Sequence, residues 1–180
     1  MKFQPISYRN ILPKISAKAM IAPNAIISGD VTIGDYSNIW YNVVIRGDVA
    51  DIKIGMNSNI QDGTIIHVTR ANHLLNKTIK KSPTIIGNNV TIGHKALLHA
   101  CTIEDAAFIG MGSVVMDNAI IESEAMVAAG AIVTAGKKIK SREIWAGNPA
   151  KLLRIMSEDE IKFIYQSAEN YVALAKEYSF

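Results

Sequence analysis

Aliphatic residues recur at every sixth position along most of the chain. They form three series, which are Ile21, Ile27, Ile33, Ile39 and Ile45, then Ile54, Ile60 and Ile66, then Ile86, Ile92, Leu98, Ile103, Ile109, Val115, Ile121, Val127, Val133 and Ile139. Within the third series only the step from Leu98 to Ile103 is five residues long. A period of six fits neither the 3.6-residue repeat of an α-helix nor the alternation of a simple strand.

Repeating units of six residues predict a parallel β-helix. In each unit a short strand places its aliphatic residue in the interior, and small or turn-forming residues take the corner. Three units make one flat-sided coil, so residues 18 positions apart stack, and we expect Ile103, Ile121 and Ile139 in one column. The alternative is a β-sandwich rich in valine and isoleucine, but its strands would be spaced about 8–12 residues apart.

The pattern changes near residue 140. Ser157 and Glu160 form the signature of a capping box, and apolar residues follow at helical spacing. This predicts an amphipathic helix that packs on the coil or on a neighbour. We interpret the 180 residues as one domain. Its parts are a β-helix at about 14–140 with an inserted loop at about 68–85, a connector at about 141–156 and a C-terminal helix at about 157–178.

Composition narrows the class of protein and its compartment. The net charge of +3 is too small to argue for a nucleic-acid partner. The sequence has no run of about 18 apolar residues to cross a membrane, and the start lacks the apolar segment of a signal peptide. The lone Cys101 gives no disulfide framework, and we expect a reduced, buried thiol. These features favour a cytoplasmic protein with no membrane partner.

Two histidines fall in one column of the expected coil. If 14 residues between Ile66 and Ile86 are an insertion, Ile66 and Leu98 lie three units apart. His67 and His99 directly follow these two residues, so they occupy adjacent rungs, which are about 4.8 Å apart in a parallel sheet. A single histidine on a β face is usually an ordinary polar residue, but two imidazoles at this spacing can share a metal ion.

His94 belongs to a different column, above Asp62. It could join His67 and His99 more easily from a neighbouring chain than from its own, which predicts an oligomer with a shared site, and three flat faces suggest a trimer. Three imidazoles with an open fourth position form a common catalytic zinc site, where zinc lowers the pKa of bound water to about 7. The same ligands would also accept iron or cobalt.

Polar residues upstream complete the cluster, and they are Arg46, Asp48, Gln61 and Asp62. Arginine–carboxylate pairs are common structural clamps, which is the simplest interpretation of the charged members. The amide of Gln61 could instead orient a metal-bound water. Arg-Gly-Asp is also a cell-adhesion tripeptide, but we give that interpretation little weight because the chain shows no export signal.

Several motifs together resemble the signature of gamma-class carbonic anhydrases, in particular their bacterial carbonic-anhydrase-like branch: Arg46-Gly47-Asp48, Gln61-Asp62-Gly63, His67, Gly93-His94 and His99. The resemblance covers nearly the whole chain. It implies a mainly β fold, a left-handed parallel β-helix of hexapeptide repeats with a C-terminal α-helix, against the general right-handed rule for crossovers. It also implies a homotrimer with zinc held at each interface by His67 and His99 of one subunit and His94 of the next.

The resemblance further implies the reversible hydration of carbon dioxide to bicarbonate by a zinc-bound hydroxide. Gln61 would hydrogen-bond this hydroxide, and Arg46 and Asp62 would pair across the interface, with Asp48 in the same network. Tyr171 matches a tyrosine that lines the site in some members of the family.

Two departures from the family pattern predict slow turnover. Val49 stands where the best-studied enzymes have a glutamate, and residues 68–85 contain no acidic residue where those enzymes carry a proton-shuttling glutamate. His73 could serve as the shuttle, and the basic loop could attract anions such as bicarbonate. Two alternative functions stay open. One is a hexapeptide-repeat acyltransferase or metal-dependent thioesterase acting on a coenzyme A thioester, and the other is a catalytically silent trimeric scaffold.

Overall fold

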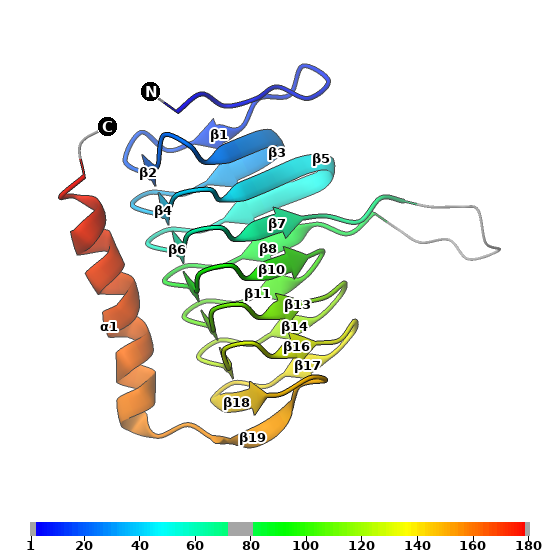
Figure 1. Cartoon of the computed structure of the whole chain (residues 1–180), viewed down its shortest axis with the longest axis vertical. Coiled ribbons are helices and arrows are strands. Elements are labelled where there is room, and N and C mark those ends of the chain that lie inside the picture. The colour runs from blue at the N-terminus through cyan, green and yellow to red at the C-terminus, as the bar shows by residue number, and fades with distance from the viewer. Residues whose placement is uncertain (1–2, 72–80, 179–180) are drawn as a thin grey trace.

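The computed structural model describes residues 3–71 and 81–178. The chain winds into a stack of parallel coils, and one helix, α1 (Glu158–Ala175), runs alongside the stack back towards its first coils (Figure 1). This confirms the prediction of a mainly β, parallel β-helical fold that ends in an α-helix. His73 lies outside the described residues, so its expected role stays a prediction.

Most strands span only two or three residues because a corner follows in every six-residue unit. One sheet contains β1 (Lys14–Ile15), β3 (Ile26–Ile33), β5 (Val44–Ile54), β7 (Ile65–His67), β8 (Thr84–Ile86), β10 (Leu97–His99), β11 (Thr102–Ile103), β13 (Val114–Val115), β14 (Ile120–Ile121), β16 (Ile132–Val133) and β17 (Lys138–Ile139). The other contains β2 (Met20–Ile21), β4 (Asn38–Ile39), β6 (Asn59–Ile60), β9 (Thr91–Ile92), β12 (Phe108–Ile109), β15 (Met126–Val127), β18 (Glu143–Ala146) and β19 (Lys151–Ile155).

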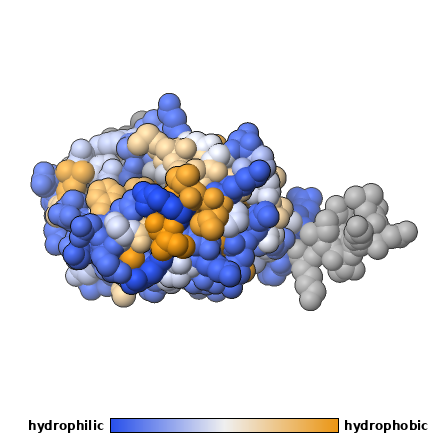
Figure 2. Space-filling model, turned by 90° about the horizontal axis from the view of Figure 1, so that it is seen from below, coloured by the Kyte–Doolittle hydropathy of each residue, from blue (hydrophilic) through white to orange (hydrophobic). Residues whose placement is uncertain are grey.

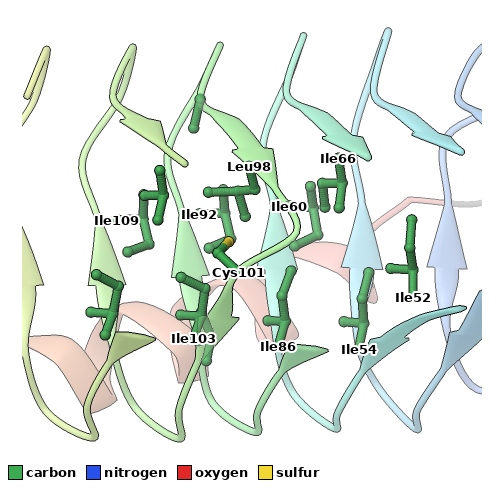
Figure 3. Close-up of a cluster of buried hydrophobic side chains, with 14 of the residues drawn as sticks. Ile52, Ile54, Ile60, Ile66, Ile86, Ile92, Leu98, Cys101, Ile103 and Ile109 are labelled. Carbon is green, nitrogen blue, oxygen red and sulfur yellow. The ribbon is translucent and has the colours of Figure 1, made fainter. Parts of the chain in front are cut away.

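The sixth-position aliphatic residues form the core. The parallel registers place Ile103 beside Ile121 and Ile121 beside Ile139, as the 18-residue spacing predicts. These three side chains are fully buried. Figure 3 shows aliphatic side chains from the sides of successive coils meeting in the interior, where Cys101 is also buried. Burial of the Cys101 thiol raises its pKa to about 12, so it stays protonated.

A glycine follows the buried isoleucine in several units, as in Ile92-Gly93 and Ile109-Gly110, and this recurrence has a steric cause. A Cβ atom on Gly93 would lie 2.6 Å from the backbone nitrogen of Met111, and one on Gly110 would lie 2.4 Å from that of Ala129. In both cases the backbone of the next coil occupies the space that a side chain would need. A glycine after the buried aliphatic residue therefore allows the coils to stack at strand spacing.

We expect Ile121→Ala to lower the free energy of unfolding by about 3 kcal/mol because it leaves a cavity between two rungs. Ile120 gives a matched control, since it precedes Ile121 on β14 but is only partly buried. Ile120→Ala should cost less than half as much. Urea denaturation of both variants checks this, and equal losses would contradict the assignment of inward and outward faces.

The segment expected as a connector contains two strands. β18 pairs in parallel with β15 and continues the stack, whereas β19 turns back and pairs with β18 in antiparallel fashion. Every residue of β19 is exposed. Figure 2, which views the molecule from below, shows apolar side chains among hydrophilic ones on this face. The glycine and proline residues of this segment predict that the six-residue repeat stops there, but they do not predict the hairpin of β18 and β19.

Helix α1 begins at the capping box that the sequence predicts, with Ser157 as its N-cap and Glu160 reaching back to it. Ile161 and Ile164 are buried against Ile144 and Met156. The C-terminal part of α1 contacts the early rungs through Tyr171, which packs edge-on against Trp40. Among the described residues, no helix has the length and apolar character required to cross a membrane.

Candidate metal centre

Two histidine side chains face each other across adjacent rungs. β7 and β10 pair in parallel with His67 directly opposite His99, so the prediction that they share a column is confirmed. His67 Nδ1 lies 3.2 Å from His99 Nε2. Both rings are partly buried, with 20% of the His67 side chain and 34% of the His99 side chain exposed. The pair is thus reachable from solvent but held by the coil.

A carboxylate holds the remaining nitrogen of each ring. His67 Nε2 lies 2.9 Å from Asp48 Oδ1, and His99 Nδ1 lies 2.6 Å from Asp117 Oδ1. An ionised carboxylate only accepts hydrogen bonds, so each ring donates its N–H to its aspartate. In the neutral rings the two facing nitrogens then both carry lone pairs. A metal ion between them, or one shared proton, would relieve their repulsion.

This donor set fits zinc. Two nitrogen ligands at tetrahedral positions around zinc are separated by about 3.3 Å, given zinc–nitrogen bonds of about 2.0–2.1 Å. The observed separation is 3.2 Å. Carboxylates that accept the second N–H of metal-bound histidines are a usual feature of such sites. Within residues 3–71 and 81–178 of one chain, no three His, Cys, Asp or Glu side chains form a complete metal-binding group.

His94 lies apart from this pair, in the turn after β9. Its Nδ1 is 2.8 Å from Asp62 Oδ2, which confirms that His94 stacks above Asp62. The backbone N–H of Tyr41 donates to the other Asp62 oxygen at 3.3 Å. The His94 side chain is 44% exposed. His94 therefore faces outward from its own coil, oriented by a fixed carboxylate.

Gln61 and Tyr171 lie on the His94 side. Gln61 is buried, and its Nε2 donates to Asn59 Oδ1 at 3.0 Å. Burial raises the pKa of the Tyr171 hydroxyl, and the negative charge of nearby Asp62 adds to the effect. The sequence-derived residues thus divide into two groups, one around His67 and His99 and one around His94.

A cavity of about 320 Å³ opens beside the first group. It is lined by Arg46, Asp48, Val49, His67, Val68, Thr69, Arg70 and His99. Within the chain, the Arg46 guanidinium donates to Asp48. Partial burial disfavours the Asp48 anion, but hydrogen bonds from His67 and Arg46 outweigh it and lower the pKa of Asp48. Burial also lowers the pKa of His67 and outweighs the hydrogen bond that the ring donates to Asp48, so the ring is neutral at pH 7 and can bind a metal.

The sequence reasoning missed Asp117. The register pairs Leu98 with Val115, a coil of only 17 residues, so Met116 is the position equivalent to His99 and Asp117 lies one residue beyond it, in the turn after β13. Column counting therefore does not single out Asp117. Partial burial opposes its ionisation, but hydrogen bonds from Thr69 and His99 prevail and lower the pKa of Asp117. It is therefore a charged acceptor that fixes the His99 ring.

Known proteins resemble this chain in sequence and fold. The family model for "Bacterial transferase hexapeptide (six repeats)" matches residues 13–47 and 100–135. Gamma carbonic anhydrase 2, mitochondrial, from Arabidopsis thaliana is 48% identical over 91% of this chain, which spans 58% of that relative's length.

A probable carbonic anhydrase from Methanocaldococcus jannaschii is 44% identical over 90% of this chain and 96% of its own length. The crystal structure of a hexapeptide transferase family protein from Anaplasma phagocytophilum is 47% identical, with a TM-score of 0.89 over 97% of this chain and 98% of that one. This chain belongs to the gamma-class carbonic anhydrase family, within the hexapeptide-repeat proteins.

Proposed function

We propose that this protein is a zinc-dependent carbonic anhydrase that interconverts carbon dioxide and bicarbonate in a homotrimer. The observation that carries the proposal is the pair of facing imidazole nitrogens, 3.2 Å apart, each on a ring anchored by an aspartate. Relatives named as carbonic anhydrases support the reaction. A cytoplasmic location is part of the same proposal.

His67 and His99 of one subunit and His94 of the next would hold the metal. When bound, zinc acts as a Lewis acid that brings the pKa of water to about 7, and three imidazoles would accept iron or cobalt as well. Asp48 and Asp117 keep the ligand rings in the tautomers that leave the facing nitrogens free.

The chain's other residues bind the reactants. Arg46 and Arg70 place positive charge on the wall of the cavity, which favours an anionic product such as bicarbonate. The Gln61 amide nitrogen is engaged by Asn59, which leaves its carbonyl oxygen to accept a hydrogen bond from a reacting water. Asp62 orients His94. The proposal also includes an ion pair between Asp62 and Arg46 of a neighbouring subunit. It further includes a contact of Tyr171 with the site.

An aliphatic stripe supports the trimer. The strand registers align one outward residue from each of six neighbouring rungs, and these are Ile26, Val44, Ile65, Leu97, Val114 and Ile132. Ile65 is 45% exposed and Leu97 38% exposed, each two residues before a histidine of the pair. A neighbouring subunit that covers this stripe would bury apolar surface beside the metal site and bring its His94 close.

Stopped-flow hydration of carbon dioxide on metal-quantified protein tests the proposed function. We expect one zinc per chain and measurable hydration, both of which His99→Ala should remove. Hydrolysis of a coenzyme A thioester by the zinc-loaded protein, without hydration, would favour the thioesterase alternative. Full zinc occupancy with neither activity would favour the scaffold, and a monomer in solution would overturn the shared site.

A further inference from the structure

The inserted segment begins directly after His67, a proposed metal ligand, and its base is tied to the coil. The backbones of Thr69 and Ser82 exchange two hydrogen bonds of 3.1 Å each. The hydroxyl of Ser82 donates to Asn118 Oδ1 at 3.1 Å, and that of Thr84 donates to the carbonyl oxygen of His67 at 2.6 Å. The base of the insertion is therefore a defined part of the structure.

One contact of this base leads directly to the histidine pair. The Thr69 hydroxyl donates to Asp117 Oδ2, while Asp117 Oδ1 accepts from His99 Nδ1 at 2.6 Å. The same carboxylate thus joins the insertion to His99. With both oxygens engaged, the carboxylate cannot rotate freely about its terminal bond, and the His99 ring stays aimed at His67.

We propose that Thr69 is a positioning residue that acts through Asp117 to fix the orientation of His99. This inference rests on the proposed metal site, and it makes the base of the inserted segment a part of that site. Loss of the hydroxyl would leave Asp117 Oδ2 to water and allow the carboxylate and His99 to turn together. The consequence is weaker metal binding, because the facing nitrogens of His67 and His99 would then have to be ordered by the metal itself.

Three variants test this role through zinc affinity, measured by competition with a chromogenic chelator. Thr69→Val keeps the shape but removes the donor, and we expect about tenfold weaker zinc binding. Thr69→Ser restores the donor and should bind zinc within about twofold of the wild type. Ser82→Ala is the matched control, since it removes a neighbouring hydroxyl that contacts Asn118 and not Asp117. It should leave zinc affinity unchanged.

A second readout separates positioning from simple destabilisation. Asp117→Asn should weaken zinc binding by about 10–100-fold, and the melting temperatures of all variants should be compared without metal. If Thr69→Val does not fold, Thr69→Ala takes its place. Zinc affinity of Thr69→Val equal to the wild type, while His99→Ala loses zinc, would overturn the role of Thr69 and leave the proposed function intact. Failure of the wild type to bind zinc would overturn both.

Discussion

Replacement of His94 by alanine is expected to reduce carbon dioxide hydration by more than about 100-fold, because loss of a direct ligand costs more than the 10–100-fold typical of outer-shell changes. The His94 side chain contacts Asp62 and lies away from His67 and His99 of its own chain. The variant should therefore fold normally and keep its melting temperature in the absence of metal. Steady-state hydration and zinc content, measured together, check this result.

A mixing experiment tests whether the site is shared. His94→Ala keeps the His67–His99 half-site, and His99→Ala keeps the His94 half-site. Unfolded together and refolded, they should form hybrid trimers in which about one quarter of the interfaces combine two intact halves. A mixture of His67→Ala and His99→Ala is the control and should recover nothing, because both lesions fall in the same half-site. No recovery in the first mixture would contradict a site shared between subunits.

Counting along the chain in six-residue units explains why much of the site could be predicted from the sequence. In a parallel β-helix with one aliphatic residue per unit, sequence distance converts directly into rung and column. His67 and His99 could be paired once the insertion was subtracted, and His94 could be placed over Asp62. Asp117 does not follow this rule, because it lies in the turn after β13, one residue beyond the position equivalent to His99, and it belongs to none of the recognised motifs.

Other contacts do not follow from periodicity. Tyr171 meets Trp40 only because α1 folds back along the stack, and no sequence spacing encodes that path. β18 lies in the segment expected as a connector because it keeps the 18-residue register with β15 but carries Trp145, not an aliphatic residue, at the sixth position, and β19 then pairs back on it.

The lining of the cavity has consequences for proton transfer. Asp48 is its one carboxylate among the described residues. It is engaged by His67 and Arg46, which hold its pKa below the usual range, so it is a poor proton acceptor near pH 7. Val49, beside it, has no titratable group. In the proposed reaction each hydration would release a proton, so without an efficient carrier the transfer of this proton to solvent would limit turnover.

We therefore expect the kcat of the wild type to rise with the concentration of an imidazole buffer, while kcat/KM stays constant because proton release follows the departure of bicarbonate. Val49→Glu should raise kcat at low buffer by about tenfold or more, since a positioned general base contributes about 10²–10⁴-fold. Val49→Gln is the control of equal size without a titratable group, and it should leave kcat unchanged. Stopped-flow hydration across buffer concentrations measures all three proteins. A wild-type kcat independent of buffer would show that another group, such as His73, already carries the proton.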